Sequence, residues 1–302
     1  MSKPAIQSIE LSKHYGRNAA LDSITLDIPE EGIIGLIGRN GSGKTTLLKL
    51  CAGLLDVTSG SLLVFGAKPM DNLSVLQDVI YSYHNIIYYK SLKLRTIMDS
   101  YAAMFSSFDL EFARKLLRYF GLEEDWKYTR LSQGMAGIFN FTCALASRAR
   151  LTLLDEPLLG MDITVRKTAY EVLLRDFTEH PRTIIVSSHM LAELEAVLSD
   201  ILLIDEGRLV LFDNIDNLRQ SAYRIEGEKQ AVDAFSAGRA VIYRRDGLGC
   251  EAVIRELYDQ RVLEEVGRYG LRVSTVRPED LCIYLTRENK EGELECLWTT
   301  SN

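Results

Sequence analysis

The segment from Gly38 to Thr45 combines residue types and spacing suited to holding a polyphosphate. It reads Gly-Arg-Asn-Gly-Ser-Gly-Lys-Thr, which has the form GxxxxGK[ST]. Glycines let backbone N–H groups point inward around phosphate oxygens, and the start of a following helix adds partial positive charge. Lys44 can reach the β- and γ-phosphates, and the Thr45 hydroxyl can bind Mg²⁺. The predicted ATP-binding residues are Gly38, Arg39, Asn40, Gly41, Ser42, Gly43, Lys44, Thr45 and Thr46.

Two carboxylates at the end of an apolar run could serve the same site. Residues 151–154 read Leu-Thr-Leu-Leu, and Asp155 and Glu156 follow them. A carboxylate at a strand end beside a phosphate loop is suited to the shell of a bound Mg²⁺ ion, so Asp155 and Thr45 are the predicted metal-binding residues. Glu156 would then orient or deprotonate an attacking water. The pair predicts nucleotide hydrolysis, with Glu156 and Lys44 among the catalytic residues.

These groups require a scaffold that brings a loop and several strand ends together. Continuous apolar runs typical of buried strands occur at 32–37, 151–154, 183–187 and 201–204. Residues 5–28 are expected to form antiparallel strands, 60–65 a further strand and 45–53 a helix. An amphipathic helix is expected over about 92–121 and more helix over 109–150, with breaks at Gly121 and Gly134. Alternating strands and helices predict an α/β fold with a mostly parallel sheet.

The pattern changes after about residue 217. Short strands are expected at 223–225, 240–243 and 271–276, and helices at 229–235 and 278–287. No catalytic constellation is found among these residues. We therefore expect an N-terminal domain over 1–216, with a helical subdomain over about 85–150, and a small α+β accessory domain over 217–302.

Composition narrows the classes of function. The chain has 302 residues, of which 47% are hydrophobic and 25% charged, as in ordinary globular proteins. A net charge of −7 argues against a broad electrostatic interaction with nucleic acid. No apolar run approaches the ~20 residues that span a bilayer. The five cysteines lack CxxC spacing, which favours reduced thiols. We expect a soluble, cytosolic chain.

Together with three further motifs in order, these residues resemble the ATP-binding subunit of an ABC transporter, over about residues 4–216. Leu131–Met135, which reads LSQGM, is similar to the signature loop LSGGQ. Gly160-Met161-Asp162 resembles the D-loop, and Ser188-His189 resembles the switch-histidine loop. Tyr15 lies where the family has an aromatic residue that stacks on adenine. The resemblance implies a P-loop NTPase cassette with a parallel core sheet, an antiparallel β subdomain and a helical subdomain.

The family also implies roles across a dimer. Two cassettes close head-to-tail over two ATP molecules, so Ser132 and Gly134 of one would contact the γ-phosphate bound by the other. His189 would contact the γ-phosphate and help to position the water, as a further catalytic residue. The sequence departs from the family at Gln133 and Met135, and His84 aligns with the glutamine that the family places in its Q-loop. Imidazole is a poor Mg²⁺ ligand, so we expect His84 to act through water or loop position.

The last motifs suggest a subgroup and its partners. The segment VSSHMLAELEAVLSDILLIDEGRLV and the stretch Val276–Leu281 resemble cassettes of ABC-2-type exporters, most like those of Gram-positive antibiotic, peptide or lantibiotic systems. This implies a membrane permease, a second cassette, and a place on the inner face of the cell membrane. The apolar and aromatic helix after residue 92 would help to form a groove for a permease helix, with Tyr88 and Tyr89 as the preferred contacts.

Two alternatives remain at this point. A soluble ABC ATPase acting on ribosomes or DNA usually has two cassettes, long coiled coils or zinc motifs, whereas this sequence has a single P-loop and neither of the other features. A nucleotide-sensing subunit would bind ATP without turning it over. Glu156 and His189 argue against that reading, while the unusual signature and His84 leave it open.

Overall fold

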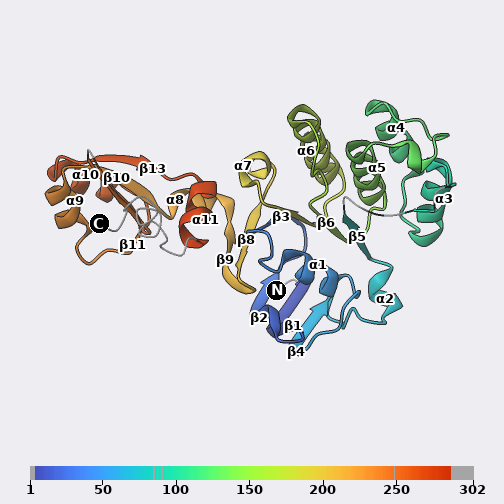
Figure 1. Ribbon diagram of the computed structural model, residues 1–302, viewed down its shortest axis with the longest axis horizontal. Coiled ribbons are helices and arrows are strands. Elements are labelled where there is room, and N and C mark those ends of the chain that lie inside the picture. The colour runs from blue at the N-terminus through green and yellow to red at the C-terminus, as the bar shows by residue number, and fades with distance from the viewer. Residues whose placement is uncertain (1–3, 84–85, 87, 90, 248, 287–302) are drawn as a thin grey trace, which may run out of the picture. The chain divides into compact units, whose positions relative to one another are not determined.

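The computed structural model describes residues 4–83, 86, 88–89, 91–247 and 249–286 (Figure 1). The predicted Q-loop residue His84 lies outside this described part. The chain forms two compact units, residues 1–212 and residues 213–302. Among the described residues, no helix has both the length and the apolar character needed to cross a bilayer.

A six-stranded sheet forms the centre of the first unit, in the order β5-β6-β7-β3-β8-β9. Its strands are β3 (Gly32–Ile37), β5 (Val79–Tyr83), β6 (Leu151–Asp155), β7 (Thr183–Ser188), β8 (Asp200–Asp205) and β9 (Arg208–Asn214). Five neighbouring strands of this sheet run parallel, namely β5, β6, β7, β3 and β8. Of these, β3, β6 and β7 are buried throughout. Ile37 pairs with Ser188, and Asp155 pairs with Ser187. The carboxyl ends of the three buried strands therefore meet at one edge of the sheet.

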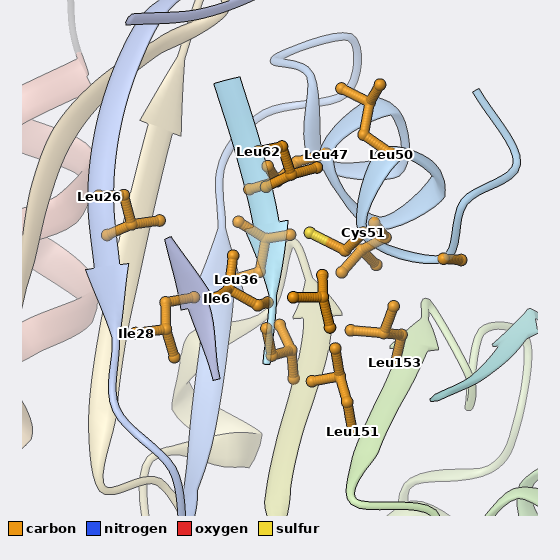
Figure 2. Close-up of a cluster of buried hydrophobic side chains, with 14 of the residues drawn as sticks. Ile6, Leu26, Ile28, Leu36, Leu47, Leu50, Cys51, Leu62, Leu151 and Leu153 are labelled. Carbon is orange, nitrogen blue, oxygen red and sulfur yellow. The ribbon is translucent and has the colours of Figure 1, made fainter. Parts of the chain in front are cut away.

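A three-stranded antiparallel sheet packs with helix α1 around a shared core. It contains β1 (Ile6–Tyr15), β2 (Asn18–Ile28) and β4 (Ser59–Val64) in the order β2-β1-β4, and α1 is Lys44–Cys51. Figure 2 shows Ile6, Leu26 and Leu62 of this sheet gathered with Leu47 of α1 and Leu36 of β3. This cluster fixes the helix that follows the phosphate loop against both sheets.

The remaining helices of the first unit are mostly gathered at the β5 end of the main sheet (Figure 1). They are α2 (Leu73–Leu76), α3 (Leu94–Met104), α4 (Leu110–Tyr119), the 3-10 helix η1 (Tyr128–Arg130), α5 (Gln133–Ala146), α6 (Ile163–Glu179) and α7 (Leu191–Leu194).

The single helix expected over about 92–121 is wrong, because the chain is extended at Phe105 and Asp109 begins a new helix. The Asp109 carboxylate accepts a hydrogen bond from the backbone N–H of Phe112 at 2.8 Å. Gly134 is also not a break, since α5 begins at Gln133 and runs through it.

A buried cluster of charges joins α4, α5 and α6. Asp176 of α6 is 4% exposed and pairs with both Arg148 and Arg182, the latter at 2.6 Å. Arg148 also reaches a carboxylate oxygen of Asp109 at 3.4 Å. Burial lowers the pKa of Arg182 to about 10. The cluster links the start of α4 to the end of α6 by charge-assisted hydrogen bonds.

The second unit contains a four-stranded antiparallel sheet with a β-α-β-β-α-β chain order. Its elements are α8 (Ile215–Gln220), β10 (Tyr223–Gly227), α9 (Lys229–Ser236), β11 (Val241–Asp246), β12 (Cys250–Ile254), α10 (Gln260–Arg268), β13 (Arg272–Thr275) and α11 (Pro278–Thr286). Side chains of α9, α10 and the sheet form its core. Helix α8, strand β12 and helix α10 are additions to the predicted elements.

Candidate functional site

The phosphate loop connects the end of β3 to the start of α1, as the sequence pattern predicts. Its close packing requires glycine at two positions. A Cβ atom at Gly38 would lie 2.2 Å from the Ile204 carbonyl oxygen, and one at Gly43, where φ is +109°, would lie 2.6 Å from the Ala20 carbonyl oxygen. The Ser42 carbonyl accepts a hydrogen bond from the Gly207 N–H at 3.0 Å. The loop is thus held by the turn between β8 and β9.

The Lys44 ammonium group lies inside this loop. Its Nζ donates to the carbonyl oxygens of Gly38 at 2.7 Å and Arg39 at 3.1 Å, and the residue is 6% exposed. Burial lowers the pKa of Lys44, while the negative charges of Glu156 and Asp155 oppose that shift. A buried cation at the start of a helix is suited to a polyphosphate.

A pocket of about 600 Å³ adjoins the loop. It is lined by Tyr15, Asn18, Ala19, Ala20, Asn40, Gly41, Gly43, Lys44, Thr45, Thr46, Glu156 and Glu206. The structure therefore brings Tyr15 at the end of β1 together with much of the predicted phosphate loop. Tyr15 is 48% exposed, so its ring is accessible to a flat ligand. The sequence indicated a turn at Glu206 but not that this residue borders the pocket.

Asp155 is buried and each of its carboxylate oxygens has a hydroxyl donor. Ser187 Oγ donates to Oδ1 at 2.7 Å, and the Tyr81 hydroxyl donates to Oδ2 at 2.9 Å. Burial raises the pKa of Tyr81, and the nearby Asp155 charge adds to the effect, so the phenol remains a donor. Ser187 Oγ also accepts from the Glu156 N–H at 2.9 Å. Neither Tyr81 nor Ser187 was expected at the site.

Glu156 and His189 form a pair beside this aspartate. Nδ1 of His189 lies 3.1 Å from each Glu156 carboxylate oxygen. Glu156 has a left-handed backbone with φ of +47°, which is costly for a residue with a side chain. The carboxylate is about one-fifth exposed and the imidazole about two-fifths exposed. Glu156 lines the pocket beside the phosphate loop, and His189 contacts it from outside that lining.

Ser132 and Gly134 are not among the residues that line this pocket. The Ser132 hydroxyl caps α5 and accepts from the Met135 N–H at 3.3 Å. A Cβ atom at Gly134 would meet only Met161 Cγ, at an ordinary 3.7 Å. Asp162 of the predicted D-loop caps α6, and its hydrogen bond with Thr164 lowers the pKa of its carboxyl group. Within the described chain, nothing near Gly134 requires a glycine there.

One predicted permease contact, Tyr88, packs against residues of its own chain. The Tyr88 hydroxyl lies 2.8 Å from the Tyr101 hydroxyl, and its ring packs edge-on against Tyr128 with centroids 4.7 Å apart. Burial raises the pKa of Tyr88. Its side chain is partly buried by these contacts, so it offers less free surface than Tyr89 does. Tyr89 remains a surface candidate, at 80% exposed.

The family model and the similar proteins all point to ABC transporters. A family model described as ABC transporter matches residues 21–159. The chain is 29% identical over 221 residues to the ABC transporter ATP-binding protein YtrB of Bacillus subtilis (strain 168), covering 73% of this chain and 76% of that protein. It is 30% identical over 224 residues to the bacitracin transport ATP-binding protein BcrA of Enterococcus faecalis, covering 71% of each.

Import proteins are also similar. The chain is 31% identical over 209 residues to the aliphatic sulfonates import ATP-binding protein SsuB of Escherichia coli (strain K12), covering 68% of this chain and 79% of that protein. Among solved structures, an ATP-binding subunit of an ABC transporter superposes with a TM-score of 0.63 at 23% identity, covering 71% of this chain and 92% of that one. This structural likeness confirms the predicted α/β cassette fold.

Proposed function

The chain belongs to the ABC transporter family and is an ATP-binding ATPase, and from this premise we propose that it powers a separate membrane permease that exports a drug, a peptide or a lantibiotic-like compound. The observation that carries the proposal is the arrangement around the pocket. Tyr15, Lys44 and Glu156 border one pocket, and Asp155 and His189 adjoin Glu156. Groups for adenine, phosphate and water thus occur together.

The geometry supports a division of roles in hydrolysis. Tyr15 stacks on adenine, the P-loop N–H groups bind the phosphates, and Lys44 offsets their charge. Glu156 accepts a proton from the attacking water as its oxygen bonds to the γ-phosphorus. The bond to the β–γ bridging oxygen breaks, and that oxygen keeps the electron pair and leaves with ADP. His189 holds the Glu156 carboxylate by hydrogen bonding and limits its rotation.

The residues present fit a Mg²⁺ ion. Among the described residues, no group of three or more His, Cys, Asp or Glu side chains could hold a metal. Mg²⁺ in nucleotide sites needs no such cage, because it uses one or two protein oxygens together with phosphates and water. The Thr45 hydroxyl, on the first turn of α1, would supply such an oxygen, and the buried Asp155 carboxylate would hold the ion through its water shell. The ion would neutralise phosphate charge.

A second cassette would complete the site. Ser132 and Gly134 are absent from the lining of the pocket of their own chain, and space remains at Gly134. We infer that this loop packs on the nucleotide bound by a partner cassette, with Gly134 allowing close approach of the backbone. The second unit would be an accessory domain of the same subunit. Bound to its permease, the chain would lie at the cytoplasmic face of the membrane.

A resistance assay tests the direction of transport. The chain and a candidate permease would be expressed, singly and together, in a bacterial host sensitive to bacitracin and lantibiotics. Export predicts a raised inhibitory concentration only when both proteins are present and Glu156 is intact. ATP turnover without any change in resistance or drug accumulation would favour the alternative, a regulatory ABC ATPase that does not drive transport. Increased drug accumulation would instead indicate import.

A further inference from the structure

The Tyr81 hydroxyl is the less expected of the two donors to Asp155. Ser187 belongs to β7, where Asp155 and Ser187 are direct partners across parallel strands. Tyr81 belongs to β5 on the other side of β6, where its own partner is Leu153 and Tyr83 is the residue opposite Asp155. The Tyr81 side chain therefore extends along the neighbouring strand to reach Oδ2.

The surroundings of Tyr81 restrain its ring. One side packs against the hydrophobic core cluster that includes Leu151 and Leu153. The ring also stacks on that of Tyr83, with centroids 5.5 Å apart. Since Asp155 is only 6% exposed, its oxygens are largely withdrawn from bulk water and depend on protein donors. The two hydroxyls together fix the plane of the carboxylate.

We propose that Tyr81 is a positioning residue of the ATPase site, which orients Oδ2 of Asp155 for the hydration shell of Mg²⁺. This inference rests on the metal-binding role proposed for Asp155. A carboxylate oxygen has two lone pairs, so the bond from Tyr81 leaves one on Oδ2 available to a metal-bound water. Tyr81 thus preorganises the carboxylate without blocking it. Loss of a residue that orients a metal-binding group typically lowers the affinity for the metal by about 10–100-fold.

Nucleotide binding with and without Mg²⁺ tests this proposal. A fluorescent ATP analogue would be titrated into the full chain in EDTA, and Mg²⁺ would then be added stepwise. Tyr81→Phe keeps the ring and removes only the hydroxyl. We expect its affinity in EDTA to equal that of the wild type and its half-saturating Mg²⁺ concentration to rise about tenfold. Tyr83→Phe is the matched control, and we expect it to match the wild type in both conditions.

Two further measurements separate the possible failures. If Tyr81→Phe weakens binding equally in EDTA and in Mg²⁺, or lowers the thermal unfolding temperature without changing the Mg²⁺ dependence, Tyr81 serves only packing and the proposal is overturned. Suppose that Mg²⁺ no longer raises the nucleotide affinity of Asp155→Asn, while Tyr81→Phe shows the same Mg²⁺ dependence as the wild type. The role of Asp155 then stands, and that of Tyr81 is overturned. If Asp155→Asn also retains the Mg²⁺ dependence, the proposed metal site itself is overturned.

Discussion

His189 Nδ1 lies 3.1 Å from both carboxylate oxygens of Glu156, so the two side chains form one hydrogen-bonded pair. The pair follows the ends of β6 and β7, where Asp155, the last residue of β6, pairs with Ser187, the next-to-last residue of β7. Strand pairing thus positions a carboxylate and an imidazole that are 33 residues apart in the chain.

Glu156→Gln should abolish most turnover and retain ATP binding. Glutamine preserves the shape of the side chain but removes the proton acceptor, and loss of a general base costs about 10²–10⁴ in rate. Steady-state ATPase activity and the mass of the ATP-bound form should be measured together, because the variant should accumulate as a closed dimer. Glu171→Gln serves as the control, because Glu171 is an exposed carboxylate on α6. Near-normal turnover by Glu156→Gln would reject the assignment.

Lys44→Ala and Tyr15→Ala should weaken ATP binding to different degrees. The lysine variant loses the buried cation of the phosphate loop, so productive binding should disappear. The tyrosine variant loses only base stacking, which corresponds to about a tenfold lower affinity. Isothermal titration measures both, and Tyr15→Phe should bind as the wild type does. An unchanged affinity for Tyr15→Ala would mean that its ring does not contact adenine.

Gly134→Ala should impair catalysis while leaving the fold intact. No described residue clashes with a Cβ atom there, and alanine favours a helix by up to about 1 kcal/mol over glycine. If the loop packs against the nucleotide of a partner cassette, displacement by one methyl group should cost about 10²-fold in turnover. Calorimetry and ATPase assays should be compared with Gly267→Ala, which also has open space around it. Full turnover would place the partner contact elsewhere.

Asp176→Ala should strongly destabilise the first unit. It leaves Arg148 and Arg182 without their shared buried partner, and removal of one member of a buried ion pair costs about 3–5 kcal/mol. For a unit of this size we expect Tm to fall by roughly 10 °C. Glu111→Ala breaks an exposed pair with Lys115 and should change stability by less than about 1 kcal/mol. Equal effects of the two variants would show that the cluster adds nothing to stability.

Tyr89→Asp should reduce copurification with the permease while leaving ATP affinity intact. Tyr89 is 80% exposed, so a charge there disturbs a docking surface without entering the core. Tyr119→Asp on α4, at 68% exposed, is the control for added charge. Wild-type yield of the complex with Tyr89→Asp would exclude Tyr89 from the docking surface. Tyr88→Asp is unsuitable for this test because it would remove the hydrogen bond with Tyr101 and place a charge beside the Tyr128 ring.

The sequence was most informative where chemistry depends on consecutive residues. The phosphate loop lies between a strand and a helix, as its pattern predicts, and Asp155 and Glu156 follow a buried strand. These features are local, because each depends on the backbone of a few neighbouring residues. The α/β fold could be predicted for the same reason, from apolar runs that alternate with helical periods.

Contacts made through tertiary structure could not be predicted in this way. Tyr81 and Ser187 reach Asp155 because β5 and β7 flank β6, and nothing in their own segments indicates that strand order. Tyr88 and Tyr89 are adjacent and chemically identical, yet Tyr88 is partly buried against its own chain and Tyr89 is exposed. A sequence pattern indicates that a segment is aromatic, but it does not indicate which ring faces solvent.

The position of Lys44 has a consequence for how salt affects this ATPase. The ammonium group is already withdrawn from bulk water and hydrogen-bonded to two carbonyl oxygens, so folding rather than nucleotide binding has removed most of its hydration. Charges shielded in this way are screened weakly by dissolved ions, whereas exposed charges are screened strongly. Arg39, which is exposed on the same loop, should therefore account for more of the ionic-strength dependence of ATP association than Lys44 does.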